Sequence, residues 1–195
     1  MIPENLLETY GAECLQYGEN ELIFSEKRRA DFYFQIKAGE VKMFNLSENG
    51  KEFLQGMFFT GESFGEPPLF GDFKYPATAI TLGSSKIYRL PKAKLMELLK
   101  SNFNLHLKVT ETLAKRLKYK SMIMKEISVH PPEHRILTLV DFLKKQYGDE
   151  TMYKVELTRQ QIADLTGLRV ETVIRAFKSL ESEGEIEIRN HKIFR

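Results

Sequence analysis

The stretch from about Asn102 to Glu126 contains neither glycine nor proline, and its apolar and small residues recur in alternating steps of four and three. This heptad spacing predicts a long helix whose seam faces another helix. We therefore expect a homodimer formed through the helix around Phe103 to Met124, the alternative being a seam that packs on the β-barrel predicted for the preceding part of the chain. The basic run from Lys115 to Lys120 is typical of a solvated helix face. The seam residues are Phe103, Leu107, Thr110, Ala114, Leu117, Ser121 and Met124.

Between about Gly18 and Tyr88 the chain shows short stretches of alternating apolar and polar residues separated by glycines. One of them runs through Phe32, Phe34 and Ile36 and predicts a half-buried strand. Asn49-Gly50 adds a hairpin signal, because both positions of a two-residue turn need positive φ. Many short strands at this spacing predict a closed β-barrel or jelly roll.

A helix-turn-helix is predicted between Thr158 and Glu183. Thr158 and Gln161 have the spacing of a capping box, which predicts a helix that begins directly after Thr158. Gly167 then allows a tight left-handed turn, and a second helix is expected from about Val170. Two short helices packed in this way are typical of a DNA-binding unit.

The exposed side of the second helix carries side chains suited to reading DNA. Arginine can donate two hydrogen bonds to guanine, and glutamate can accept one from the cytosine amino group. Glu171, Arg175 and Arg169 are therefore the expected base contacts. Because Glu171 and Arg175 lie one helical turn apart, the alternative is an ion pair within the helix.

After this helix, apolar residues on both sides of Asn190-His191 predict a small hairpin, or wing. Arg189, Lys192 and Arg195 place positive charge there. Four glutamates precede them and repel phosphate, so we expect contact with DNA only at the tip of the wing. The complete winged motif predicts duplex DNA as a partner.

The overall composition adds no argument for a polyanionic partner, because 29 basic residues nearly balance 27 acidic ones. Cys14 is the single cysteine, so one chain cannot supply a disulfide or a four-cysteine iron–sulfur site. No histidine precedes His106, which argues against a haem or a cupin-type metal site in the barrel. Without an export signal or a membrane span, we expect a cytoplasmic protein with no membrane partner.

Several motifs together resemble the Crp/Fnr family of bacterial transcription regulators over nearly the whole chain. They are residues 31–41, 50–52 and 61–66 in the barrel, the seam helix, and residues 157–163 and 171–175 in the helix-turn-helix. The resemblance implies an α+β fold with three parts: a cyclic-nucleotide-binding-like β-barrel (jelly roll) sensor at 1–100, a dimerisation helix and hinge at 101–130, and a winged helix-turn-helix at 131–195. It also implies a homodimer on a near-palindromic site, with RNA polymerase as a further candidate partner.

The resemblance also implies roles for individual residues. Glu171 and Arg175 match the family's base-reading pair. Val170 replaces a polar or basic residue of cyclic AMP receptor proteins, so the operator sequence does not follow. We add Lys178 and Lys192 as expected backbone contacts. The positions that match family contacts to the DNA backbone are Thr158, Arg159, Gln160 and Thr172.

The expected effector pocket comprises Gly65, Glu66, Lys74, Tyr75 and Ser121. In the family an arginine binds the phosphate of a cyclic nucleotide through two parallel hydrogen bonds, but Tyr75 stands at that position here. Lys74 offers a point charge, which does not reproduce the two parallel hydrogen bonds of an arginine. We therefore do not expect cyclic AMP as the effector, and no cofactor is implied. Either an unknown effector or ligand-independent action fits the sequence.

Neither a catalytic site nor a metal site is expected. The sequence shows no nucleophile–base pair, so we do not expect an enzyme. His130 and His134 stand on opposite sides of Pro131-Pro132, which breaks their helical spacing. We therefore assign both histidines to hinge or surface packing. The alternative function is a small-molecule-binding or protein-interaction module without specific DNA binding.

Overall fold

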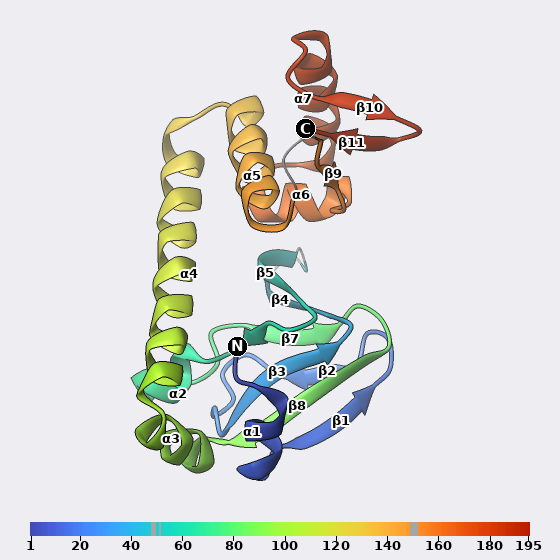
Figure 1. Cartoon of the computed structure of the whole chain (residues 1–195). Helices are drawn as coiled ribbons and strands as arrows, with labels where there is room; N and C mark the ends of the chain where they lie inside the picture. Colours follow the sequence, from blue (N-terminus) through green and yellow to red (C-terminus); the bar gives the residue numbers. More distant parts are fainter. Residues whose placement is uncertain (48–49, 51, 149–151) are drawn as a thin grey trace. The chain divides into compact units, whose positions relative to one another are not determined.

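The computed structural model describes residues 1–47, 50, 52–148 and 152–195. The chain separates into two compact units, Met1–Arg116 and Leu117–Arg195. Helix α4 (Phe103–Val129) begins in the first unit and ends in the second (Figure 1). This helix confirms the long helix predicted from the seam.

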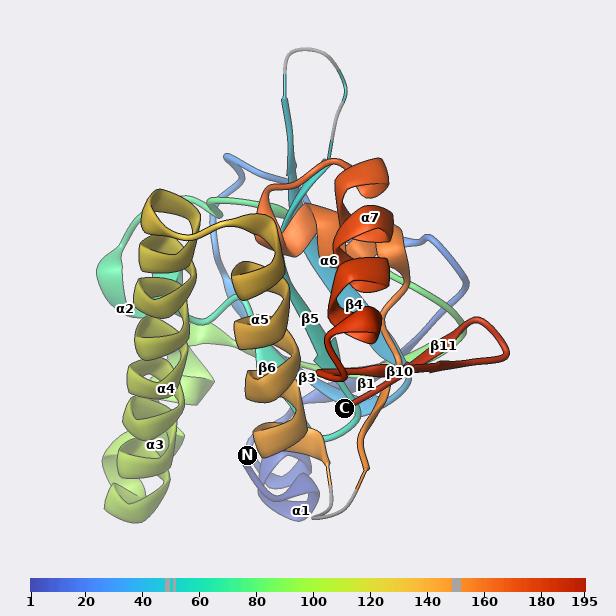
Figure 2. The same ribbon diagram turned by 90° about the horizontal axis from the view of Figure 1, so that it is seen from above.

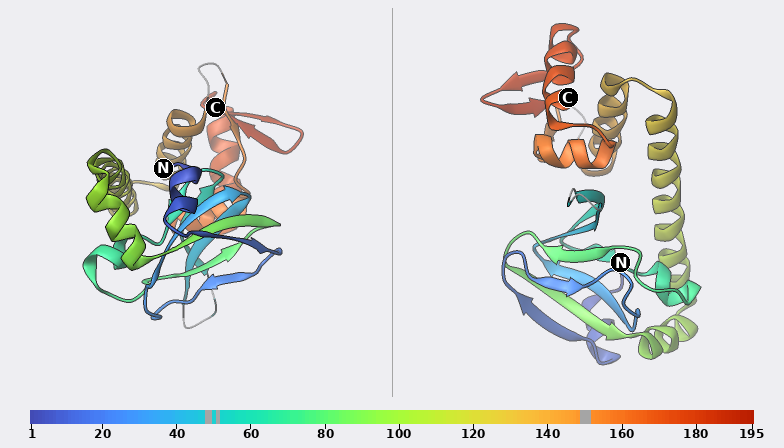
Figure 3. Two further views of the ribbon diagram at one scale, coloured as in Figure 1. Left: turned by 60° about the horizontal axis from the view of Figure 1, so that its bottom comes forward. Right: turned by 180° about the vertical axis from the view of Figure 1, so that it is seen from behind.

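Two four-stranded antiparallel sheets form the first unit (Figure 1; Figure 3, left). Their orders are β1–β8–β3–β6 and β2–β7–β4–β5, which is the double-sheet arrangement of a jelly roll. The predicted fold class is thus confirmed. The strands are β1 (Glu13–Tyr17), β2 (Leu22–Phe24), β3 (Phe32–Ala38), β4 (Glu40–Leu46), β5 (Glu52–Phe59), β6 (Ser63–Phe64), β7 (Thr78–Thr81) and β8 (Ser85–Pro91).

The hairpin expected around Asn49-Gly50 is formed by β4 and β5. The two strands pair antiparallel, and the pairing of the described residues ends with Leu46 opposite Glu52. Gly50 has the positive φ, 73°, that the prediction requires. Asn49 lies outside the described residues, so the two-residue turn itself stays a prediction.

Strand β1 begins before the region in which strands were predicted. Of the described strands it pairs with β8 alone, at the edge of its sheet, and its side chains are exposed or half-buried. Because neither face of β1 is fully buried, its residues show no clear alternation in the sequence.

Aromatic rings fill the interior between the sheets. Phe24, Phe34 and Phe64 are buried, and their ring centroids lie 5.5–6.0 Å apart. Burial of rings of this size is a main source of stability in a small domain, and offset ring pairs add to it. The interior of the jelly roll is therefore largely occupied by its own side chains.

Helices cover part of the jelly roll. They are α1 (Glu4–Thr9), α2 (Pro67–Gly71), α3 (Lys92–Ser101) and the first part of α4. The sequence pattern did not single out α3, which buries Leu95, Leu98 and Leu99. On α4, Leu105 and Val109 join the same core.

The predicted seam of α4 is not the face that packs on the chain. All seven seam residues are exposed, and Phe103 and Leu117 each keep 69% of their surface accessible. The four seam residues in the first unit, Phe103, Leu107, Thr110 and Ala114, therefore do not pack on the jelly roll, which argues against the alternative in which the seam packs on the barrel.

Besides the end of α4, the described part of the second unit contains three helices and a small sheet (Figures 1 and 2). Both α5 and α6 pack against α7, and the strand order of the sheet is β10–β11–β9. None of the described helices has the length and apolar character needed to cross a bilayer. The elements are α5 (Pro132–Tyr147), β9 (Lys154–Val155), α6 (Arg159–Thr166), α7 (Val170–Ser182), β10 (Glu187–Arg189) and β11 (Lys192–Phe194).

Candidate nucleic-acid interface and sensor pocket

The first helix of the predicted DNA-binding unit starts with the expected capping box. The backbone amide of Gln161 donates to Thr158 Oγ1 at 3.2 Å, and the backbone amide of Thr158 donates to Gln161 Oε1 at 2.7 Å. These two bonds satisfy donors that a helix start otherwise leaves unpaired. The prediction that α6 begins at Arg159 is confirmed.

A left-handed turn follows α6, also as predicted. Gly167 has φ 69°, and the next amide, that of Leu168, donates to Ala163 O at 2.9 Å. Helix α7 then begins at Val170. Because the turn is so short, α7 is held directly against α6.

Helix α7 has one buried and one exposed face. Val173, Ala176, Phe177 and Leu180 are each at most 1% exposed and anchor the helix in the second unit. Arg169, Glu171, Arg175 and Lys178 are exposed, and Thr172 is half-buried. The structure thus brings together five of the residues predicted to contact DNA, all at or beside one helix.

The alternative interpretation of Glu171 and Arg175 was an ion pair within α7. Within the described ranges, no salt bridge joins the two side chains. Both side chains are exposed to solvent. Their polar groups therefore stay accessible to a partner.

The remaining predicted contacts lie at the start of α6 and on the wing. Thr158 and Gln160 are exposed, and Gln160 donates to Asp164 at 2.9 Å. Half-buried Arg159 donates to the carbonyl of His191 at 3.4 Å, which ties the start of α6 to the wing tip. Lys192 is exposed beside that tip.

The wing is the antiparallel hairpin of β10 and β11 (Figure 3, right). Asn190 and His191 have φ of 48° and 62°, as a tight two-residue turn requires. Two of the predicted wing cations face carboxylates: Arg189 pairs with Glu187, and Arg195 pairs with Asp141 and Glu185. Their positive charge is therefore partly compensated within the protein.

The expected effector pocket contains a buried ion pair in the first unit. Glu66 is 2% exposed, and its carboxylate accepts a hydrogen bond from Ser63 Oγ. From α4, Arg116 Nη1 donates to Glu66 Oε2 at 2.6 Å, and Nη2 donates to Ser63 O at 2.5 Å. The guanidinium also lies 5.1 Å from the centroid of the Phe58 ring. Both carboxylate oxygens of Glu66 are thus hydrogen-bonded within the chain itself.

Arg116 was missed in the sequence because it belongs to a basic run that is typical of a solvated face. Its side chain is 28% exposed, whereas that of neighbouring Lys115 is 74% exposed. The signal that distinguishes the two is the helical phase, since Arg116 follows Leu105 and Val109 on the packed face of α4.

Tyr75 fills space beside Gly65. Its ring stacks on Phe24 at 3.7 Å with an interplanar angle of 9°, and its hydroxyl donates to Phe32 O at 3.4 Å. Burial raises the pKa of Tyr75, and the Asp31 and Glu66 carboxylates raise it further, so the phenol stays neutral. A Cβ atom on Gly65 would lie 3.0 Å from the Phe24 ring. Tyr75 thus supplies an aromatic wall and no cation.

Two residues of the predicted pocket lie elsewhere. Lys74 is exposed and lines an open hollow of about 440 Å³ together with Arg29, Phe73 and Lys92. Ser121 is exposed on α4, in the second unit. The structure therefore brings together Gly65, Glu66 and Tyr75 but does not bring Lys74 into the group.

Comparison with known proteins finds a matching domain family in each unit. The cyclic nucleotide-binding domain family matches residues 14–102, and the Crp-like helix-turn-helix domain family matches residues 134–194. The chain is 24% identical to the transcriptional activatory protein AadR of Rhodopseudomonas palustris, over 91% of this chain and 74% of AadR. It is 28% identical to the cAMP-activated global transcriptional regulator CRP of Haemophilus influenzae, over 86% of this chain and 76% of the relative.

Solved structures share the fold along most of the chain. FixK2 from Bradyrhizobium japonicum matches with a TM-score of 0.79 at 20% identity, covering 93% of this chain and 91% of FixK2. A CooA mutant from Carboxydothermus hydrogenoformans matches with a TM-score of 0.84 at 15% identity, covering 100% of this chain and 86% of CooA. With a nucleotide-binding-type jelly roll followed by a winged helix-turn-helix, the chain belongs to the Crp/Fnr family of transcription regulators.

Proposed function

We propose that this regulator binds duplex DNA as a homodimer, at a near-palindromic site whose half-sites are about one helical turn apart. The observation that carries the proposal is the exposed face of α7, where arginine, glutamate and lysine side chains project from a helix anchored by its opposite face. The family's activity is transcription regulation and not an enzymatic reaction, and we assign the same kind of activity to this chain.

Three residues read base edges in this proposal. Arg175 donates two hydrogen bonds to a guanine, Glu171 accepts one from a cytosine amino group, and Arg169 contacts a base near the start of α7. Six other residues contact phosphates and fix the protein on the duplex. They are Thr158, Arg159, Gln160, Thr172, Lys178 and Lys192.

The exposed seam of α4 is the proposed dimer interface. An apolar stripe that includes Phe103, Leu107, Leu117 and Met124 is costly to leave in water. A second copy of α4 with the same heptad spacing buries it. Two copies related by twofold symmetry then supply the paired recognition helices that a palindrome requires.

Placing a charge in the seam is expected to dissociate the dimer. In Leu117→Glu the proposed interface acquires two carboxylates, one from each chain, without partners. Sedimentation equilibrium should show that the dimer Kd rises by about a hundredfold or more. Lys118→Glu, which changes the exposed neighbour outside the seam, is the matched control. Equal dimer dissociation constants for the two variants would rule out this interface.

Cyclic AMP is expected to leave the thermal unfolding temperature of the protein unchanged. Tyr75 provides no cation for the phosphate, and Glu66 is already paired with Arg116. A nucleotide present at about a hundred times its Kd stabilises a protein by about 2.7 kcal/mol, which thermal unfolding detects easily. A clear, saturable rise in Tm with cyclic AMP would contradict this assignment of the pocket.

Selection from a pool of random duplexes tests the proposed function. The purified, effector-free protein is expected to enrich a palindrome with half-sites about one turn apart. This result also identifies a regulator that is active without a ligand. Binding without sequence preference and with weak salt dependence would instead favour a module that has lost specific DNA recognition.

A further inference from the structure

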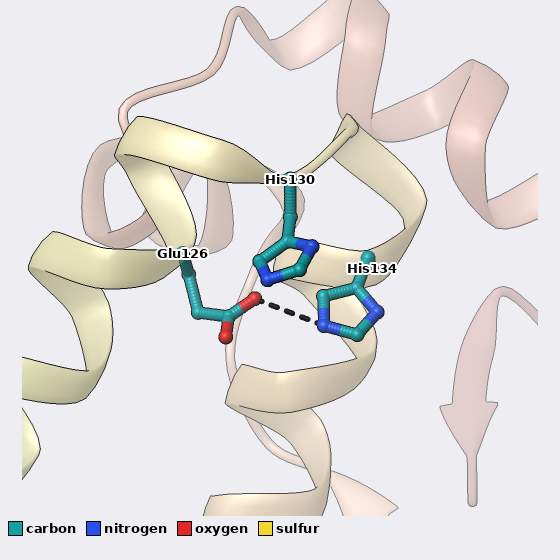
Figure 4. A group of neighbouring side chains, drawn as sticks. All are labelled: Glu126, His130 and His134. Atoms are coloured by element: carbon teal, nitrogen blue, oxygen red, sulfur yellow. Dashed lines mark ion pairs between the residues drawn. The ribbon is translucent and has the colours of Figure 1, made fainter.

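Three side chains of metal-ligand type meet at the junction of α4 and α5, outside the nucleic-acid interface and the sensor pocket. Glu126 lies in the last turn of α4, His130 directly follows that helix, and His134 lies in the first turn of α5. One ligand atom of each residue lies within 4.8 Å of the other two. Figure 4 shows the carboxylate and both imidazoles directed toward one another.

The meeting of the two histidines was not expected from the sequence. The prolines between them do end α4, as predicted, but the imidazole centroids lie only 4.1 Å apart. The backbone bend brings His134 back toward the last turn of α4, where Glu126 lies. The sequence did not predict Glu126 as a third member of the group formed with the two histidines. An interrupted helix therefore still places the three side chains in one group.

The carboxylate of Glu126 is unusually placed for an acidic group. Its side chain is 8% exposed, whereas that of His134 is 51% exposed. Glu126 Oε2 lies 3.2 Å from His134 Nε2, yet in the described part of the chain no donor with hydrogen-bond geometry reaches this atom. A buried carboxylate needs compensation by a cation, and a divalent ion bound by the three side chains would supply it.

The three ligands match the preferences of one class of ion. Two imidazoles and one carboxylate suit Zn²⁺ and its neighbours in the first transition row, and not Mg²⁺ or Ca²⁺, which prefer oxygen ligands alone. With zinc–ligand bonds of about 2.1 Å, tetrahedral ligand atoms stand about 3.4 Å apart. The ligand atoms lie within 4.8 Å of one another here, so ion binding would draw the more distant of them together. The exposed His134 leaves an entry route for the ion.

Backbone contacts hold the segments that carry these ligands. The His130 amide donates to Glu126 O at 3.1 Å, so the helical hydrogen bonding of α4 continues to His130. Arg135 Nε donates to His130 O at 2.8 Å, and the Arg135 amide donates to Pro131 O at 3.2 Å. The bend is thus ordered by the chain itself, which lowers the cost of assembling the ligand set.

We propose that Glu126, His130 and His134 bind one Zn²⁺ ion per chain and that the ion ties the end of α4 to the start of α5. Helix α5 packs against α6 and α7, so the ion would restrain the attachment of the helix-turn-helix to the dimer helix. The binding site stands independently of DNA recognition. The regulatory consequence rests on the proposed function.

Calorimetric titration of the tag-free, chelator-treated full chain with Zn²⁺ tests the site. One ion per chain is expected. Loss of a group that only supports a ligand typically weakens binding by about 10–100-fold, so His130→Gln, His134→Gln and Glu126→Gln should each weaken it by about a hundredfold or more. His106→Gln, an exposed histidine near the start of α4, should bind like the wild type.

A Co²⁺ spectrum separates this site from adventitious binding. Visible ligand-field bands without a thiolate charge-transfer band are expected, because Cys14 is not a ligand, and Cys14→Ser should give the same spectrum. Binding that survives in all three ligand variants, or that disappears in Cys14→Ser, would overturn the site. So would an absence of Zn²⁺ binding by the wild type while circular dichroism shows it folded.

The effect of the ion on DNA binding is measured separately on a selected duplex. Zn²⁺ should change the wild-type Kd by about fivefold or more and leave that of His134→Gln unchanged. An equal response of both proteins would overturn the coupling. If Zn²⁺ binds with the expected stoichiometry but no duplex is ever selected, the proposed function fails and the metal site stands.

Discussion

Arg175→Ala should strongly weaken sequence-specific DNA binding while leaving the fold intact. Arg175 is exposed on α7, and the buried face of that helix is made by other residues. A bidentate arginine–guanine contact contributes about 1–3 kcal/mol of discrimination. A dimer uses this contact twice, so the affinity for the selected site should fall by about thirtyfold or more.

Lys178→Ala is the matched control for this experiment. Lys178 lies on the same helix and is also exposed, but it is assigned to a phosphate. Its loss should weaken binding to all sequences alike. The slope of the logarithm of the binding constant against the logarithm of the salt concentration should fall in magnitude by about one per lost contact. Fluorescence anisotropy on specific and scrambled duplexes at several salt concentrations distinguishes the two effects. If Arg175→Ala keeps the wild-type sequence preference, Arg175 does not read a base.

Arg116→Ala should strongly destabilise the jelly roll. Among the described residues, the variant leaves the Glu66 carboxylate, 2% exposed, with Ser63 Oγ as its remaining donor. Removing one partner of a buried ion pair typically costs about 3–5 kcal/mol, because the other charge stays buried. Some water can reach Arg116, whose side chain is 28% exposed, so we expect a loss of about 3 kcal/mol.

Hydrogen exchange in β3 and β8 is the suitable measurement, because a chain of two units need not unfold in one step. Lys115→Ala, the exposed neighbour on α4, should leave exchange in these strands unchanged. Arg116→Met combined with Glu66→Gln should recover much of the loss, because no charge is then left buried. If hydrogen exchange in these strands is the same in Arg116→Ala as in Lys115→Ala, the ion pair does not stabilise this unit.

The helix-turn-helix was predicted well because its signals are local. The capping box of Thr158 and Gln161 and the left-handed Gly167 each depend on residues within a few positions of one another. The long helix α4 was predicted for a related reason, since a heptad repeat accumulates over many turns. Such patterns are visible before any tertiary contact is known.

The sensor pocket was predicted less completely because its contacts are distant in sequence. Glu66 and Arg116 are separated by 50 positions, and nothing in the sequence shows that they meet. The metal-ligand group depends in the same way on a bend in space, because His134 reaches Glu126 only after the chain turns at the prolines. Tertiary geometry, and not residue type, decides both sites.

Simultaneous reading of two half-sites by one dimer is tested by the affinity for the selected palindrome when half a helical turn of DNA is inserted between its half-sites. Two recognition helices held by one dimer need both half-sites on the same face of the duplex. The insertion should weaken binding to about the level of a single half-site, and a full-turn insertion should weaken it less. Equal affinity for the original and the half-turn duplex would contradict a dimer that reads both half-sites at once.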